Sequence, residues 1–127
     1  MQNLLLVGLG GFMGALLRYS VGGFFQQWSK SIHFPYGTLA VNLLGCLLFG
    51  FLSQLAETRG IISSEARAFL FVGLLGAFTT FSTFGNDTVS LFQDGKDFLS
   101  FLNIGLHLIL GLSAVWLGKS LVSFPWK

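Results

Sequence analysis

Four long apolar stretches constrain the fold of this chain more than any other feature. They cover approximately residues 4–25, 36–56, 66–84 and 98–121. A helix needs about 20 apolar residues to cross the hydrocarbon core of a bilayer, and each stretch is of that order. The stretches are continuously apolar rather than alternating, which disfavours a β-barrel. We therefore predict an all-α membrane protein, residues 1–127, with four transmembrane helices in a single domain.

The composition excludes most soluble functions. Charged residues make up 9% of the chain and hydrophobic residues 53%, whereas soluble domains carry about 25% charged residues. A soluble fold of this size could not cover its surface with so few polar side chains. The basic residues are scattered rather than clustered as in nucleic-acid-binding proteins. No nucleophile–base pair suggests an enzyme. We expect neither catalysis nor a nucleic-acid partner, and a lipid bilayer as the surroundings.

The basic residues divide almost evenly between the two sides of the membrane. With four spans, the termini and the middle connection lie on one side. That side has Arg59, Arg67, Lys119 and Lys127, and the other has Arg18, Lys30 and Lys96. Because the positive-inside rule needs an imbalance, either orientation can insert. Alternatively, Arg18 lies too deep to count, which leaves a weak preference for one orientation.

The third stretch contains an unusual polar segment, Gly73-Leu-Leu-Gly76-Ala-Phe-Thr79-Thr80-Phe81-Ser82-Thr83-Phe84. Its glycines and hydroxyl residues weaken a helix and leave backbone groups that need partners. At helical spacing, three pairs would each share a face: Phe81 with Phe84, Thr80 with Thr83, and Thr79 with Ser82. Helix packing would explain a single Ser or Thr. The whole run, with its paired Phe residues, favours a permeation surface.

Polar residues also occur in the second and fourth stretches. Thr38 and Asn42 lie one turn apart, and an amide in lipid is costly unless it faces an interior or a water-filled path. An interhelical hydrogen bond of Asn42 is an equally good interpretation. Asn103 and His107 share a face of the fourth stretch. A lone His could relay protons, but we expect a hydrogen-bonded structural role for it.

Small residues four apart mark the first stretch. The pairs Gly10 with Gly14 and Gly11 with Ala15 suit close helix packing. Arg18 is the basic residue that lies well inside a span. It either extends to the interface or draws anions toward a pore mouth.

The intramembrane polar groups suit a small anion. They are neutral hydrogen-bond donors, together with Arg18 and phenyl rings, and an anion binds N–H groups, O–H groups and ring edges. A drug exporter would need a central carboxylate, and the four predicted spans contain none. A small multidrug-type dual-topology exporter is therefore the second interpretation. A non-transporting assembly subunit is the third. One chain of four helices is too small to enclose a pore by itself, so we expect a two-fold dimer.

Three motifs resemble the CrcB/Fluc fluoride channels of microorganisms: Gly11-x-x-Gly14-Ala15-x-x-Arg18-Tyr19, Gly37-Thr38-Leu39-x-Val41-Asn42-x-x-Gly45 and the segment from Gly73 to Phe84. The resemblance extends over essentially the whole chain. It implies a fluoride-selective channel in the plasma (inner) membrane that exports fluoride passively and lowers its cytoplasmic concentration. It further implies an antiparallel, dual-topology homodimer with two pores and a third helix broken near its middle.

The resemblance also implies a set of site residues. Together with the polar residues above, the candidate anion pore comprises Thr38, Asn42, Thr80, Phe81, Ser82, Thr83, Phe84 and His107, with Arg18 at its entrance. In the family, carbonyls at the helix break bind a structural sodium ion, and Gly76 and Thr79 match those positions. Asp87 stands where the family commonly has Glu, and His107 lies on a face where relatives tend to have hydroxyls.

Overall fold

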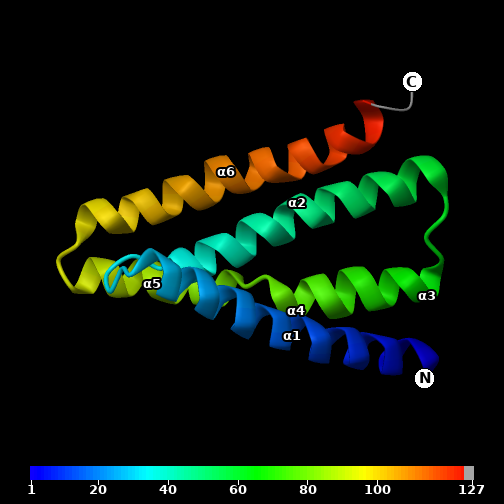
Figure 1. The fold of residues 1–127 in the computed structure, drawn as a ribbon, viewed down its shortest axis with the longest axis horizontal. Helices are drawn as coiled ribbons and strands as arrows, with labels where there is room; N and C mark the ends of the chain where they lie inside the picture. The colour runs from blue at the N-terminus through cyan, green and yellow to red at the C-terminus, as the bar shows by residue number, and fades with distance from the viewer. Residues whose placement is uncertain (125–127) are drawn as a thin grey trace.

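The computed structural model describes residues 1–124, which form helices joined by short connections (Figure 1). The first two spans are α1 (Gln2–Ser29) and α2 (Tyr36–Arg59). The third span consists of α3 (Ser64–Arg67), the π-helix η1 (Ala68–Leu75), α4 (Gly76–Phe78) and α5 (Phe81–Gln93). The fourth is α6 (Asp97–Ser123). Lys127, one of the basic residues counted above, lies outside the described residues.

The four predicted spans are confirmed, since four helical segments of the described chain are long and apolar enough to cross a membrane. The predicted end of the third span was wrong. It continues to Gln93 rather than ending at Phe84, so Asn86 and Asp87 lie on α5 instead of in a loop. After an interruption in mid-span, α5 needs its 13 residues, about 20 Å at 1.5 Å per residue, to reach the membrane surface.

The spans run side by side along the long axis of the molecule (Figure 1). The α2 helix packs most extensively against α6, and α1 packs against η1. The N-terminus, the α2–α3 connection and the end of α6 lie at one end of the molecule. The α1–α2 and α5–α6 connections lie at the other (Figure 1).

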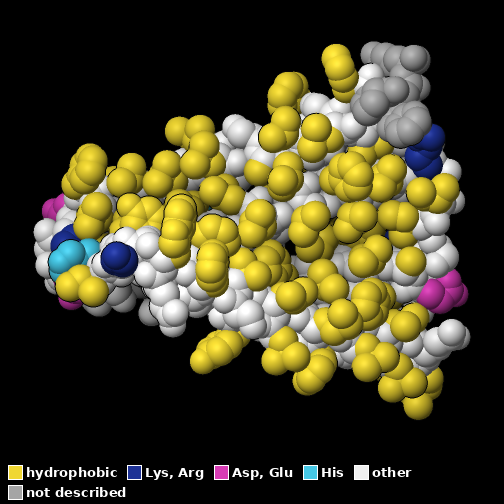
Figure 2. Space-filling view, viewed as in Figure 1, with side chains coloured by type: hydrophobic (Ala, Val, Ile, Leu, Met, Phe, Trp, Pro, Cys, Tyr) yellow, Lys and Arg dark blue, Asp and Glu magenta, His cyan; other side chains and the backbone are white. Residues whose placement is uncertain are grey.

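Most of the surface is apolar, as expected for a protein surrounded by lipid. Hydrophobic side chains cover the middle of the face seen in Figure 2, and the charged side chains visible there gather toward its two ends. Large side chains such as Leu4, Phe12 and Trp116 are exposed in the described chain. Because lipid is as apolar as these side chains, they need no burial inside the protein.

Glycines allow α1 to contact η1 closely. Gly10 and Gly14 are buried, and a Cβ added at either one would overlap a backbone carbonyl of η1. The predicted packing role of this pair is therefore confirmed. It does not extend to the second pair, because a Cβ at Gly11 would have its nearest neighbour 4.0 Å away and Ala15 is exposed.

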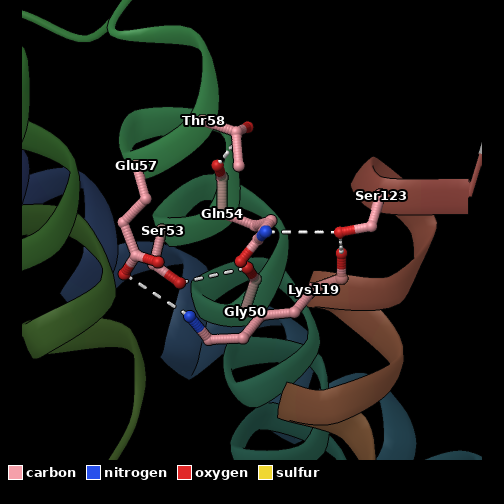
Figure 3. A network of polar contacts seen from close by, with 7 residues as sticks. All are labelled: Gly50, Ser53, Gln54, Glu57, Thr58, Lys119 and Ser123. Atoms are coloured by element: carbon pink, nitrogen blue, oxygen red, sulfur yellow. Dashed lines mark hydrogen bonds and ion pairs between the residues drawn. The ribbon is translucent and has the colours of Figure 1, made fainter. Parts of the chain in front are cut away.

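Polar contacts align α2 with α6 near their C-terminal ends (Figure 3). The Gln54 amide donates to Ser123 Oγ over 3.2 Å. Lys119 Nζ lies 3.5 Å from Glu57 Oε1. These side chains are exposed, and exposed ion pairs stabilise a fold by at most about 1 kcal/mol.

Candidate functional site

The third span is interrupted at Thr79 and Thr80. Their backbone is extended, with φ −86° and ψ 158° at Thr79 and φ −152° and ψ 113° at Thr80. The hydroxyl groups bind the helix ends at this break. Thr79 Oγ1 donates to the Leu75 carbonyl over 3.0 Å, and Thr80 Oγ1 accepts the Thr83 N–H over 3.2 Å, which caps α5. The wide turns of η1 precede the break, and π-helical turns occur frequently at functional sites.

Asn42 on α2 binds the backbone at this break. Its Oδ1 accepts the Thr80 N–H over 2.8 Å, and its Nδ2 donates to the Thr80 carbonyl over 3.1 Å. The same Nδ2 lies 3.0 Å from His107 Nε2 on α6. An amide has two N–H hydrogens, so Nδ2 can donate to both atoms when His107 Nε2 carries no hydrogen. Of the two interpretations of Asn42, the interhelical hydrogen bond is observed.

The break releases the backbone carbonyls of residues 76–79 from their helical partners, and the carbonyls of Gly76 and Thr79 illustrate this. In a continuous helix the Thr80 N–H would donate to the Gly76 carbonyl and the Thr83 N–H to the Thr79 carbonyl. Here those N–H groups donate to Asn42 Oδ1 and Thr80 Oγ1 instead. Proteins bind dehydrated alkali cations through such backbone carbonyls. The exposed backbone at Gly76 and the half-buried Thr79 therefore fit a cation held by carbonyl oxygens.

One side of the break borders a groove of about 310 Å³, which we call the aromatic groove. Its lining includes Asn42, Phe49, Thr80, Phe81, Phe84 and His107. The ring centroids of Phe81 and Phe84 lie 5.5 Å apart, so the predicted aromatic pair is confirmed. Phe84 also packs on the His107 ring, with centroids 4.3 Å apart. The Phe81 side chain is 82% exposed, so the groove is open on its side.

The other side of the break borders a second groove of about 420 Å³, the hydroxyl groove. It is lined by Arg18, Thr38, Thr80 and Thr83, among others. Thr80 Oγ1 donates to Thr83 Oγ1 over 3.0 Å. Because each hydroxyl has one hydrogen, that of Thr83 is not used in this bond. It can donate to a molecule in the groove.

A third hollow of about 330 Å³, the polar mouth, lies where α5 approaches the α1–α2 connection. Thr38 and Asp87 border it together with Asp94. Lys96 Nζ lies 2.8 Å from His33 Nδ1 at the same place. This hollow was not predicted from the sequence, because the third span was expected to end at Phe84, before Asp87.

The structure divides the predicted pore residues into two groups that meet at Thr80. Asn42, Phe81, Phe84 and His107 border the aromatic groove, and Arg18, Thr38 and Thr83 border the hydroxyl groove. Ser82 is exposed, and its Oγ lies 3.3 Å from Thr80 Oγ1. The predicted shared face of Thr79 and Ser82 was wrong, because Thr79 has extended backbone and belongs to no helix.

Thr88 supports the site, although it is not among the residues predicted from the sequence. Its Oγ1 donates to the Phe84 carbonyl over 2.7 Å and accepts from Asn103 Nδ2 over 2.9 Å. Asn103 is fully buried, and its backbone carbonyl oxygen lies 3.0 Å from His107 Nδ1. The sequence signal that could have identified Thr88 is its helical spacing from Phe84, four residues earlier.

Comparison with known proteins identifies the family. Residues 5–119 match the family described as CrcB-like protein, Camphor Resistance (CrcB). The chain is 42% identical over 120 residues to the fluoride-specific ion channel FluC 3 of Methanosarcina barkeri, covering 94% of this chain and 89% of that protein. It is 49% identical over 122 residues to the fluoride-specific ion channel FluC of Shewanella sp. strain ANA-3, covering 96% and 97%.

A third relative, the fluoride-specific ion channel FluC of Methylobacillus flagellatus, is 40% identical over 127 residues, covering 100% of this chain and 99% of that protein. The similarity thus includes all four spans, the break and both grooves. A match of this extent, on a chain with four apolar spans, shows that the protein is a multi-pass membrane protein belonging to the CrcB family.

Proposed function

We propose that this chain is a subunit of a fluoride-selective channel that exports fluoride passively. Its relatives carry the name of fluoride-specific ion channels, and the family comprises ion channels rather than enzymes. The observation that carries the proposal is the break at Thr79 and Thr80. It presents polar groups and phenyl rings to two grooves within a membrane span, and polar groups inside a membrane usually mark a pathway.

The two grooves supply different interactions with a small anion. Fluoride is strongly hydrated, so a selective path must replace its water with donors at close range. The Thr83 hydroxyl supplies a strong donor, and the edges of the Phe81 and Phe84 rings supply weaker contacts from which the ion can leave. Asn42 would share one of its N–H groups with the ion. Arg18, which borders the hydroxyl groove, attracts anions to the entrance.

Passive conduction is sufficient for protection against fluoride. The weak acid HF crosses membranes and dissociates inside the cell, which traps the anion. A channel lets that anion leave and thereby lowers cytoplasmic fluoride. No catalytic step and no energy source are needed for this function.

We further propose that two antiparallel subunits form the channel. The aromatic groove is open, and the largely exposed Phe81 lies in the middle of its span, where a partner subunit would cover it. The near balance of basic residues allows both orientations to insert, which supports dual topology. By two-fold symmetry such a dimer has two equivalent pores.

A structural sodium ion at the dimer centre completes the proposal. Gly76 and Thr79 of each subunit would hold it through the carbonyls that the break releases. The ion would satisfy carbonyl groups within the membrane and offset part of the charge of a nearby anion. Preparing and assaying the protein with N-methylglucamine in place of sodium should reduce fluoride flux. Full flux under these conditions would contradict a requirement for sodium.

The test is reconstitution of the purified protein into liposomes loaded with fluoride, with release followed by a fluoride-selective electrode. We expect rapid release of fluoride, and no release of chloride from matched liposomes. Protein-free liposomes give the background rate. A multidrug-type exporter would instead move a lipophilic cation against a proton gradient, and an assembly subunit would move neither. Fluoride release no faster than that from protein-free liposomes would overturn the proposal.

A further inference from the structure

We propose that His107 is a positioning residue that fixes the orientation of the Asn42 amide by presenting a bare ring nitrogen to it. This inference deepens the proposed function and rests on it for its effect on flux. It begins with the tautomer of His107. The ring Nδ1 lies 3.0 Å from the backbone carbonyl oxygen of Asn103. Because a carbonyl oxygen only accepts, Nδ1 must carry the hydrogen in this contact.

In a neutral imidazole with the hydrogen on Nδ1, the other nitrogen is an acceptor. His107 Nε2 is therefore the acceptor for Asn42 Nδ2, 3.0 Å away. A chain of hydrogen bonds then runs from Asn42 through His107 to the backbone of α6. It joins α6 to the break in the third span through a single side chain of α2.

The three contacts of Asn42 permit one amide orientation. With Oδ1 toward the Thr80 N–H and Nδ2 toward the Thr80 carbonyl and His107 Nε2, each donor meets an acceptor. Exchanging the amide oxygen and nitrogen would place a donor against a donor at the Thr80 N–H and acceptors against acceptors at the other two atoms. His107 Nε2 supplies one of the two acceptors that reject the exchanged orientation.

His107 is also the partner that Asn42 can release to a passing ion. The Thr80 carbonyl is a backbone group, whereas the contact with His107 joins two side chains that both border the aromatic groove. An anion there can accept the hydrogen bond from the Asn42 N–H that otherwise points at Nε2. When the ion leaves, Nε2 accepts that hydrogen bond again. The amide thus keeps its orientation between ions.

Two substitutions separate this role from simple packing. His107→Phe keeps an aromatic ring against Phe84, whose centroid lies 4.3 Å from that of His107, but removes the acceptor. His107→Gln loses the ring but places an amide oxygen at about the reach of Nε2. If His107 positions Asn42, the Phe variant should lose at least tenfold in fluoride flux and the Gln variant should recover most of that loss. The reverse order would mean a packing role and would overturn the proposal.

A spectroscopic measurement keeps the inference testable if a variant does not fold or if the parent conducts no fluoride. The sequence contains only two histidines, so the variant His33→Gln leaves His107 as the single signal in [15N]-histidine-labelled protein. We expect a protonated Nδ1 and a bare, hydrogen-bonded Nε2, and a shift of the Nε2 resonance on Asn42→Ala. A protonated Nε2, or an Nε2 resonance unaffected by Asn42→Ala, would overturn the proposal. Absence of flux in the parent protein with the expected spectrum would contradict the proposed function and leave the positioning role intact.

Discussion

At the scale of single residues, Asn42 is the side chain on which the site most depends. It makes three hydrogen bonds, two to the backbone of Thr80 and one to His107. Leaving a buried polar group unsatisfied costs about 1–3 kcal/mol. The same side chain therefore holds the break together and borders the proposed path of the anion.

Asn42→Asp should abolish fluoride conduction. The carboxylate loses both Nδ2 hydrogen bonds and places a negative charge where an anion must pass. Two like charges about 4 Å apart repel by roughly 4 kcal/mol at an effective dielectric constant of about 20. We therefore expect at least about a 100-fold lower rate of fluoride release from liposomes. Asn3→Asp, at the exposed N-terminal end of α1, is the matched control, and undiminished release by the Asn42 variant would refute its role.

Phe81→Ile should slow conduction while leaving the fold intact. The side chain is largely exposed in the single chain, so its loss leaves no cavity within the subunit. A favourable aromatic edge contact is worth about 0.5–1.5 kcal/mol, which corresponds to roughly a two- to thirteenfold change in rate. The release assay measures this change. Phe12→Ile, on the exposed face of α1, controls for loss of a ring, and equal rates in both variants would eliminate the contribution of the ring edge.

At the scale of elements, two features define the third span. One is the contact of η1 with the small residues of α1, and the other is the break before α5. The first brings two backbones together without intervening side chains, which is how membrane helices gain packing energy. The second exchanges helical hydrogen bonds for bonds to hydroxyl and amide side chains.

Gly14→Ala should destabilise the protein by about 1–3 kcal/mol, the usual cost of overpacking. An added Cβ would overlap the Leu74 carbonyl, and backbone atoms cannot move aside cheaply. Unfolding in detergent micelles by heat or denaturant measures the difference. Gly8→Ala is the matched control, because nothing lies within 4 Å of a Cβ at Gly8. If the two variants proved equally stable, the contact between α1 and η1 would not be close-packed.

Thr80→Val should destabilise the protein by about 1 kcal/mol because it removes the cap of α5. Valine keeps the shape of threonine but cannot accept the Thr83 N–H or donate to Thr83 Oγ1. Thr80→Ser retains the hydroxyl and should be nearly neutral in the same unfolding measurement. A Ser variant as unstable as the Val variant would assign the effect to packing of the methyl group instead.

At the scale of the whole molecule, the distribution of charge governs orientation. At one end of the spans lie Arg59, Arg67 and Lys119, and at the other lie Lys30 and Lys96. Neither end therefore has a marked excess of basic residues to hold it in the cytoplasm.

Dual topology predicts that a residue in one connection is reached from both sides of the membrane. In a Cys46→Ser background, a cysteine introduced by Ser31→Cys should react with an impermeant thiol reagent in about half of the molecules in intact cells. The remaining half should react only after permeabilisation. Labelling of all molecules, or of none, before permeabilisation would show a single orientation and contradict the antiparallel dimer.

The sequence alone determined the four spans and most of the polar and aromatic residues that border the two grooves, because long apolar runs and costly intramembrane polar groups are local signals. The tertiary structure alone decided which groove each site residue borders and that α5 runs to Gln93. It also showed that Asn42 Nδ2 lies within hydrogen-bond distance of both the Thr80 carbonyl and His107 Nε2, since this depends on atoms 38 and 65 residues away along the chain. Such contacts arise from packing between helices, which residue spacing within one helix cannot specify.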